Sequence, residues 1–444
     1  MQPRDRQAHT LWPYLVIGAV LLLAFSDPLP AAMPDMSGDW VVRIEATEVS
    51  NGTPNYVRLT LDQRGSDLSG SLPNGRVSGT VEENGEFQIR TPWQIWIGSV
   101  QGDEFSASTK STDRWQWTLS LTALRQERSH SPTQTHTFDP SEFHLHYSSS
   151  TPAVLKINPG DTVRTQTVDA LGVDANGRKR TAGGNPLTGP IYVEGAYPGD
   201  TLVVHLARIR LNRDTAITTN TLLPTAIESH YNAQLEPLDF AYVTWNLDHD
   251  SGEARLDNPS EVMKDYSIPL RPFLGSIGVA PPRGDTIRSI RAGAFGGNID
   301  YNRLIEGTTL YLPVFHPGAL LFFGDGHAAQ GDGELSGNAL ETSLDVELRI
   351  DVIEGASPRM PRAESGEELM ASGIDGALEG ALQSATTNMS RWLQKDYGLD
   401  RYELATVLGT AIDYDIAEIV GAEYHIVARV NKTLLNKISP TDVP

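Results

Sequence analysis

Alternation of apolar and polar residues dominates the first part of this chain. YVRLTLDQ at residues 56–63 alternates, and WQIWIGSV at residues 93–100 alternates aromatic with polar residues. Alternation places one face of a strand against a core and the other in water. Asn-Gly pairs at 74–75 and 84–85 are typical of tight hairpin turns. The pattern predicts that residues 36–125 form a small antiparallel β sandwich or barrel.

Four tryptophans in this unit have two interpretations. They are Trp93, Trp96, Trp115 and Trp117. Their rings could form a stacking platform for carbohydrate, or they could pack the core. We favour core packing, because aromatic residues in alternating strands most often face inward.

A second, larger domain is predicted for residues 140–444. A polar stretch without periodicity at 126–139 reads as a linker, and strand patterns continue after it to about residue 354. The turn sequence Pro-Gly-Asp-Thr occurs twice, in NPGDTV at 158–163 and in YPGDTL at 197–202. Proline presets φ and glycine accepts positive φ in such turns. The repeat suggests an internal duplication or two hairpins of one kind, with turn aspartates that bind backbone N–H groups.

The period changes toward the C-terminus. Apolar residues recur at helical spacing over 377–393, and Gly398 follows as a C-terminal stop. Asp400 and Glu403 have the spacing of a capping box for a second helix. A strand pattern returns at 424–430. We therefore expect a mainly β protein with a C-terminal α-helical element.

The N-terminus has the features of an export signal. Arg4 and Arg6 precede the apolar run LWPYLVIGAVLLLAF at residues 11–25, and two alanines stand at 31–32. A spanning helix needs about 20 apolar residues, so this run has the length of a signal-peptide core. We predict a cleaved signal peptide at residues 1–32, with a membrane anchor as the alternative. The mature protein is then expected in the periplasm or outside the cell.

Composition excludes several kinds of partner and chemistry. The 444 residues carry a net charge of −21, which argues against binding nucleic acid or an anionic membrane through a basic surface. Membrane contact is expected only through an uncleaved N-terminal segment. The chain has no cysteine, so disulfides, thiolate ligands and a cysteine nucleophile are excluded.

Two clusters of polar residues are candidates for a site. His144 and His146 alternate in FHLHY and so share one face of a strand, and Asp169 follows a later strand in TVDA. Asn298 and Asp300 follow two glycines in FGGNID, and such glycines let the backbone approach a ligand closely. The alternatives are histidines that are exposed or already hydrogen-bonded, and an ordinary Gly-Gly-Asn turn before a strand.

A third cluster follows the apolar run LLFF at 320–323. Asp325 and His327 are two residues apart at a strand end, so their side chains can point the same way, and Glu334 and Glu341 come next. Histidine with carboxylates and without cysteine is the composition of a hydrolytic zinc site, whereas all-oxygen sets suit Ca²⁺ or Mg²⁺. The alternative is a Gly-Asp turn, which is common.

Several longer stretches resemble a known family. They are PAVLKINPGDTVRTQTVDA, GNPLTGPIYVEGAYPGDTL, FLGSIGVAP, GGNIDYNRL, YLPVFHPGALLFFGDGHAAQGDGELSGNALE and the helical tail. From about residue 140 onward the chain resembles the acetamidase/formamidase family, and residues 36–130 fall outside the resemblance. The resemblance implies a mainly β, sandwich-like core, metal dependence, and hydrolysis of short amides to a carboxylate and ammonia.

The resemblance also suggests roles for the candidate residues. The expected metal ligands are His146, Asp169, Asp325 and His327, for Zn²⁺ or, as an alternative, Ca²⁺. A carboxylate must take a proton from water and give one to the departing nitrogen, and Glu334 is the first choice, with Glu341 second. Asn185 and Asn298 are expected to bind the substrate amide.

Three functions from different classes remain open at this stage. The first is metal-dependent hydrolysis of a linear carboxamide. The second is hydrolysis of a cyclic amide, such as a lactam, or of another C–N bond. The third is a non-catalytic, secreted ligand-binding protein on the same scaffold. The expected partners are a small amide substrate and further copies of the chain in a homo-oligomer.

Overall fold

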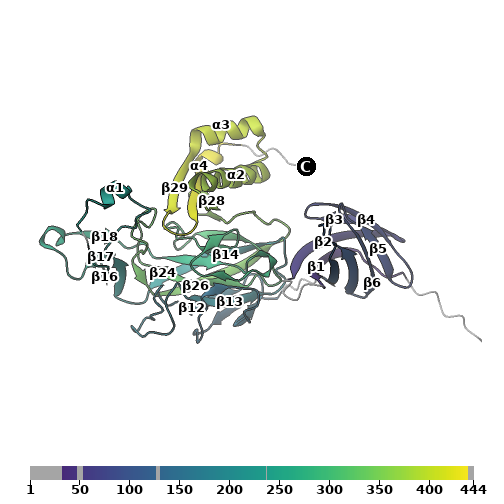
Figure 1. Ribbon diagram of the computed structural model, residues 1–444, viewed down its shortest axis with the longest axis horizontal. Coiled ribbons are helices and arrows are strands. Elements are labelled where there is room, and N and C mark those ends of the chain that lie inside the picture. The colour runs from purple at the N-terminus through teal and green to yellow at the C-terminus, as the bar shows by residue number, and fades with distance from the viewer. Residues whose placement is uncertain (1–32, 48–53, 127–130, 237, 439–444) are drawn as a thin grey trace, which may run out of the picture.

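The structure is a computed structural model that describes residues 33–47, 54–126, 131–236 and 238–438. The predicted signal peptide, residues 1–32, lies outside the described residues. Within the described part of the chain, no helix is long and apolar enough to cross a membrane. Figure 1 shows a barrel at one end, a body of sheets in the middle and helices on top of that body.

The first unit is a closed antiparallel barrel. Each strand pairs with the next one along the chain, and the first strand also pairs with the last. The strands are β1 (Gly38–Ala46), β2 (Asn55–Arg64), β3 (Asp67–Leu72), β4 (Gly75–Val81), β5 (Glu86–Arg90), β6 (Ile95–Gln101), β7 (Glu104–Lys110) and β8 (Thr118–Arg125). The inward positions of the alternating pattern fill the interior, with Trp40, Phe87 and Phe105 in contact. This barrel is therefore a packed core and not a ligand container.

The four tryptophans do not act together. Trp96 is buried in the barrel core, whereas the side chains of Trp93 and Trp115 are 56% and 62% exposed. Trp117 lies next to Trp115, with ring centroids 6.3 Å apart. Core packing thus holds for Trp96 and not for Trp93 or Trp115.

Two large sheets form the body of the protein. The eleven-stranded sheet has the order β18-β17-β16-β15-β25-β24-β19-β22-β21, with β13 joined to β24 and β11 joined to β13. Its strands are β11 (Leu155–Ile157), β13 (Leu187–Val193), β15 (Thr215–Thr219), β16 (Tyr242–Asp248), β17 (Glu253–Leu256), β18 (Ser267–Pro269), β19 (Phe273–Gly278), β21 (Ala292–Gly293), β22 (Gly296–Asn298), β24 (Leu321–His327) and β25 (Glu341–Thr342).

The nine-stranded sheet has the order β29-β30-β28-β27-β23-β14-β26-β12-β9. Its strands are β9 (Thr135–Thr137), β12 (Thr162–Gln166), β14 (Thr201–Leu211), β23 (Thr309–Pro313), β26 (Leu344–Ile353), β27 (Arg362–Glu364), β28 (Glu368–Asp375), β29 (Ile412–Glu418) and β30 (Tyr424–Asn431). Residues of both sheets share one apolar cluster, for example Leu206 and Ile350 with Ile277 and Phe322. A small separate sheet pairs β10 (His146–Tyr147) with β20 (Ile287–Arg288).

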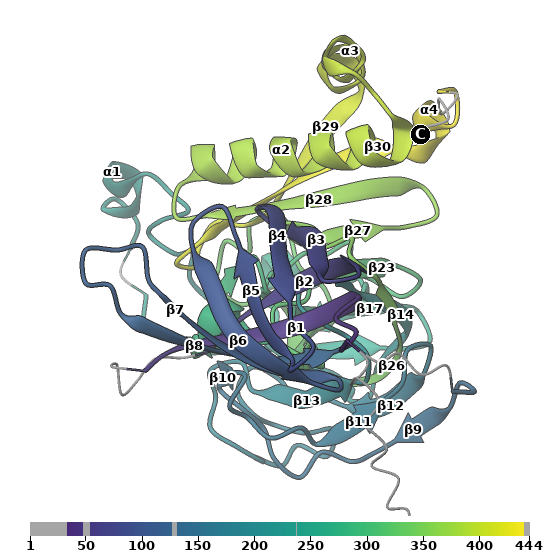
Figure 2. The same cartoon turned by 90° about the vertical axis from the view of Figure 1, so that its right-hand side faces the viewer.

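A helical layer covers one part of the nine-stranded sheet. Helix α2 (Leu378–Tyr397) lies over β28, as Figure 2 shows. It ends at Gly398, whose φ of +67° closes the helix as predicted. Helix α3 (Arg401–Ala411) begins with the predicted capping box, in which the side chains of Asp400 and Glu403 each accept a backbone N–H. The short helices are α1 (Ser229–Asn232) and α4 (Lys432–Leu435). The predicted mainly β fold with a C-terminal helical element is confirmed.

The predicted linker, residues 126–139, is not entirely a linker. Its segment Thr135–Thr137 is strand β9, which pairs in parallel with β12 at the edge of the nine-stranded sheet. The sheet therefore begins before residue 140. The sequence of this segment shows no strand pattern. It is extended because it pairs with β12.

The two Pro-Gly-Asp-Thr turns use their aspartates in the same way. Asp161 accepts the N–H of Asn158 at 2.9 Å, and Asp200 accepts the N–H of Tyr197 at 3.0 Å. Each aspartate then binds a cationic or polar side chain from earlier in the chain. For Asp161 this is the ring of His136, at 2.8 Å, in the segment of β9.

For Asp200 the earlier side chain belongs to the barrel. Arg58 on β2 donates to Asp200 Oδ1 at 3.1 Å and also bonds Asp39 of β1. The side chain of Asp200 is fully buried, and that of Arg58 is 18% exposed. A second contact joins the two bodies, because the rings of Tyr56 and His316 meet edge to face. A buried ion pair thus joins the barrel to the body.

We expect the substitution Arg58→Met to lower the free energy of unfolding by about 3 kcal/mol, because it leaves the buried Asp200 carboxylate without its cation. The matched control is Arg43→Met, on neighbouring β1, whose ion pair with Glu45 is exposed and should be worth about 1 kcal/mol or less. Denaturant unfolding, followed separately for barrel and body, measures both. Equal losses in the two variants would contradict a supporting role for Arg58.

Candidate active site

The candidate site lies at the end of strand β24. Every residue of this strand is buried, because β13, β19 and β25 all pair with it. The last three residues of the apolar run LLFF form its first part, and Asp325 and His327 lie at its end. Asp325 has a φ of +56°, which residues with a side chain rarely adopt. Such backbone strain is typical of functional sites.

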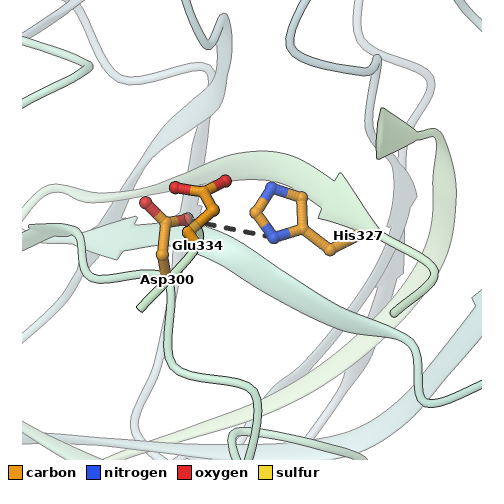
Figure 3. A group of neighbouring side chains, drawn as sticks. All are labelled: Asp300, His327 and Glu334. Carbon is orange, nitrogen blue, oxygen red and sulfur yellow. Dashed lines mark ion pairs between the residues drawn. The ribbon is translucent and has the colours of Figure 1, made fainter. Parts of the chain in front are cut away.

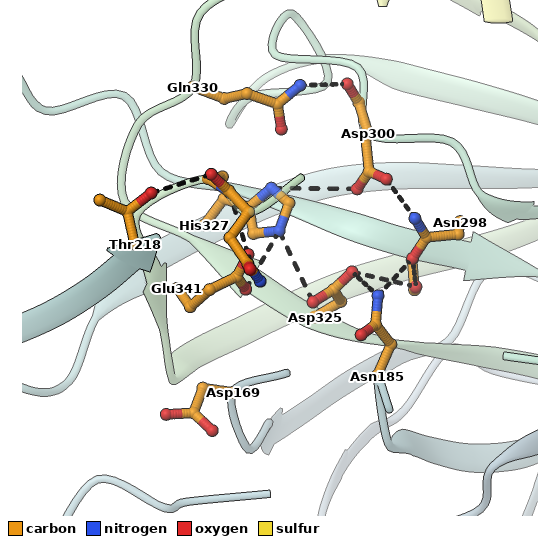
Figure 4. A network of polar contacts seen from close by, with 12 residues as sticks. Asp169, Asn185, Thr218, Asn298, Asp300, Asp325, His327, Gln330 and Glu341 are labelled. Carbon is orange, nitrogen blue, oxygen red and sulfur yellow. Dashed lines mark hydrogen bonds and ion pairs between the residues drawn. The ribbon is translucent and has the colours of Figure 1, made fainter. Parts of the chain in front are cut away.

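His327 is the centre of a buried group of carboxyl groups. Its Nε2 lies 3.3 Å from Glu341 Oε2 and 3.6 Å from Asp325 Oδ1. Its Nδ1 lies 4.0 Å from Asp300 Oδ1. All four side chains are at most 2% exposed. Figure 4 shows carboxylates on both sides of the imidazole ring, so each ring nitrogen faces an acid.

Glu334 completes this group on the side of Asp300. Ligand atoms of Asp300, His327 and Glu334 all lie within 4.8 Å of one another, and the same holds for Asp325, His327 and Glu341. Figure 3 shows the carboxylates of Asp300 and Glu334 next to each other beside the ring. Glu334 sits in a turn with a φ of +51° and is 8% exposed. We call Asp300, Asp325, His327, Glu334 and Glu341 the acid cluster.

Two asparagines and a serine hold the acids in place. Asn185 Nδ2 donates to Asp325 Oδ2 and to Asn298 Oδ1, each at 2.7 Å. Ser276 Oγ also donates to Asn298 Oδ1, at 2.8 Å, and Asn298 Nδ2 donates to Asp300. The structure therefore places Asn185 and Asn298 at the cluster, as expected, but turns their amide groups toward its carboxylates. In this position both side chains support the acids.

Glu418 is a neighbour of the acid cluster that the sequence analysis missed. It ends strand β29, and its backbone forms a bridge with Gly333, next to Glu334. It is 5% exposed and close enough to raise the pKa of both Asp300 and Glu334. Glu418 follows Glu334 by some 80 residues, and nothing in the sequence indicates that the two lie close together.

Burial and mutual repulsion shift the protonation of these groups. Burial, followed by the neighbouring acids, raises the pKa of Asp300 well above its usual value, and burial raises that of Glu341. Burial also raises the pKa of Glu418, to about 8. Burial alone would lower the pKa of His327, but Glu341 and Asp325 outweigh it and raise this pKa. The four carboxyl groups of the acid cluster and that of Glu418 surround one imidazole. They cannot all be charged unless a cation compensates them.

The structure places two of the four predicted metal ligands outside the acid cluster. His146 is exposed on β10, where it pairs with Arg288. Asp169 is buried, but its carboxylate accepts the N–H groups of Leu171 and Val173 and a bond from Arg213 at 2.8 Å. Figure 4 shows Asp169 apart from the other acids. Neither residue joins the acid cluster, whereas Asp325 and His327 do.

The geometry of the acid cluster fits a divalent cation. Among the described residues, several of its buried atoms have no hydrogen-bond partner: both ring nitrogens of His327, Asp300 Oδ1, Asp325 Oδ1 and Glu341 Oε2. These are the atoms that face one another in the two groups. Four carboxylates and a single imidazole make an oxygen-rich set, which suits Ca²⁺, Mg²⁺ or Mn²⁺ as well as Zn²⁺.

Gly275 on β19 leaves the space that the cluster occupies. A Cβ at this position would lie 2.4 Å from Asp300 Oδ1 and 2.7 Å from His327 Cε1.

We expect Gly275→Ala to displace both side chains and to lower kcat/KM by about 10²-fold, because catalysis is sensitive to displacements of about 1 Å. Gly366→Ala is the control, because a Cβ there meets nothing within 4 Å. Steady-state kinetics of both folded variants make the measurement, and equal activities would show that the cluster needs no such space.

Known proteins match the body of this chain. The Acetamidase/Formamidase family matches residues 131–285 and 283–422. The acetamidase of Mycolicibacterium smegmatis is 36% identical over 72 residues, which are 16% of this chain and only 18% of that protein. The crystal structure of an acetamidase from Yersinia enterocolitica superimposes with a TM-score of 0.59 and 29% identity, over 68% of this chain and 93% of that one. An acetamidase from Bacillus halodurans gives 0.59 and 27%, over 68% and 100%.

Fold and site together define the class. The body is a two-sheet β protein whose buried acid cluster lies at the end of a central strand. The chain belongs to the acetamidase/formamidase family. The match covers the two sheets except for β30, together with α2 and α3, and it leaves out the barrel, as the sequence resemblance indicated.

Proposed function

We propose that this protein hydrolyses a short carboxamide to a carboxylate and ammonia at the acid cluster. The observation that carries the proposal is the convergence of buried carboxyl groups on His327 in a chain of the acetamidase/formamidase family. The relatives named above are described as acetamidases. Because the cluster residues are at most 8% exposed, the substrate must be small.

The acid cluster would hold a divalent cation through Asp325, His327 and Glu341. When bound, such a cation polarises a carbonyl oxygen and lowers the pKa of water. Glu341 is suited to a fixed role, because Ala339 N–H and the Asn338 side chain bind its Oε1 at 3.0 and 3.3 Å. Its Oε2 is thereby held toward His327. We therefore assign Glu341 to holding the cation and not to proton transfer.

Glu334 is the residue we assign to proton transfer. It is the most exposed carboxyl of the cluster and so lies where a substrate would arrive. Its neighbours in the cluster are His327 and the carboxylate of Asp300. A carboxyl group in this place can accept a proton from water and deliver one to the amide nitrogen, which leaves poorly unless it is protonated. Asn185 and Asn298 then act by orienting Asp325 and Asp300.

The test combines metal content with ammonia release. The purified full-length protein is analysed for bound metals and incubated with formamide and with acetamide. We expect ammonia release in proportion to enzyme, loss of activity after treatment with a chelator, and recovery when the metal is restored. A protein that binds metal but releases no ammonia from these amides would contradict the proposal. If it instead consumes a lactam, the site acts on cyclic amides.

A further inference from the structure

A cleft with aromatic and charged walls lies apart from the acid cluster. Its volume is about 680 Å³, and it opens between the last turns of α2 and the strands β23 and β27. No residue of the acid cluster lines it. Tyr311, Trp392 and Tyr397 contribute aromatic surface, and Arg362, Lys395 and Lys432 contribute positive charge. Figure 2 shows α2 lying along β28 in this region.

Arg362 is held rigidly at this cleft. Its Nε donates to Asn388 Oδ1 at 2.8 Å, and its Nη2 donates to the Asn388 carbonyl at 3.1 Å. The orientation of Asn388 is fixed, because its Nδ2 donates to the carbonyls of Pro361 and Ser372, each at 3.0 Å. The guanidinium lies over the Trp392 ring, 5.1 Å from the ring centre. Its Nη1 makes no hydrogen bond among the described residues, so one donor group is fixed in place and unused.

Arg362 makes no direct ion pair with a carboxylate in the described part of the chain, although the Asp396 carboxylate is close enough to favour its charged form. The two nearby acids of the lining are engaged elsewhere: Glu364 binds Lys432 at 2.6 Å, and Asp396 accepts the indole N–H of Trp392 at 2.7 Å. Burial lowers the pKa of Arg362 to about 10, which still leaves it charged at neutral pH. Arg362 is thus a partly buried cation with a fixed, unused N–H donor and no direct ion pair, which a ligand anion in the cleft could supply.

We propose that this cleft binds a small organic oxyanion that carries a flat apolar group. Arg362 Nη1 would donate to the oxyanion, because a guanidinium suits planar carboxylate and phosphate-type groups. Lys395, at the exposed rim, adds a second positive charge. Trp392, Tyr311 and Tyr397 would contact the apolar part. The alternative is that Arg362 serves only to fasten α2 to the sheet through Asn388.

The experiment is a calorimetric titration of the full-length protein with two probes, benzoate and phenylphosphonate. We expect saturable binding of at least one of them, weakened by added NaCl, and at least ten-fold weaker binding of the neutral benzyl alcohol. Binding of benzoate alone assigns the cleft to carboxylates, and binding of phenylphosphonate alone assigns it to phosphate-type anions. The variant His327→Gln should bind as the wild type does, which separates this cleft from the acid cluster.

Two variants test the position of the ligand. Arg362→Met should lower affinity at least ten-fold, whereas Arg359→Met, an exposed arginine three residues earlier that does not line the cleft, should leave it unchanged. If Arg362→Met does not fold, Ala356→Trp replaces it, because a bulky side chain on the lining should block the cleft while keeping Arg362. The proposal is overturned if the wild type binds neither anion saturably. It is equally overturned if a folded Arg362→Met or Ala356→Trp protein binds as well as the wild type.

Discussion

Glu334→Gln should lower kcat by about 10²–10⁴-fold, the usual contribution of general acid–base catalysis, while the protein keeps its metal. Glutamine preserves the size of the side chain, and it should keep the backbone at this position, where Glu334 has a φ of +51°. What it removes is the ability to take up and release a proton. KM should change little, because the lost interaction belongs to the transition state.

The matched control for Glu334→Gln is Asp332→Asn, an exposed acid in the same loop whose carboxylate accepts a bond from Asn302 at 2.8 Å. It should keep activity within a few-fold. Loss of metal together with activity in Glu334→Gln would make Glu334 a ligand. Retention of both would leave it only a turn residue, and either result would refute the assignment to proton transfer.

His327→Gln should abolish both metal binding and activity. His327 is the only imidazole in the acid cluster and lies between its two groups of ligand atoms. Loss of a supporting residue around a metal typically costs about 10–100-fold in affinity, and loss of the shared ligand should exceed this. Metal content per chain, measured after gel filtration, gives the result.

Asp169→Asn is the informative comparison for His327→Gln. Its carboxylate is buried like those of the cluster but binds Arg213 and two backbone N–H groups. This variant should lose stability, because Arg213 loses the carboxylate of its ion pair, and it should keep its metal. Equal metal contents in the two variants would show that the acid cluster is not the metal site.

Local signals explain which parts of the fold the sequence predicts. Gly398 and the capping box of Asp400 and Glu403 mark helix ends through contacts within a few residues, and all are where the pattern put them. Closure of the barrel depends on β1 pairing with β8, some 80 residues later, so alternation alone left a sandwich and a barrel equally open. Strand β9 exists only because β12 lies beside it.

For the candidate site, too, the sequence predicted the residues that lie close together along the chain and not those that come from distant parts of it. Asp325, His327, Glu334 and Glu341 lie within one short stretch, and their sequence spacing already brought them together. Glu418 reaches the cluster from the far end of the chain and was missed. Asp169 lies outside the cluster, and alternation does not reveal that its own loop supplies N–H donors for its carboxylate.

The ion pair between Arg58 and Asp200 has a consequence for the origin of this two-part architecture. Asp200 belongs to a turn that repeats the turn of Asp161, and in each turn the buried aspartate also binds a cationic or polar side chain from earlier in the chain. The stretch that carries Asp200 is part of the resemblance to the family, whereas the barrel lies outside the family match. The barrel thus attaches through a carboxylate that the body already holds with the N–H groups of Tyr197 and Gly355. A barrel transplanted to another protein of the family would need Arg58 on its own surface and an aspartate in the matching turn.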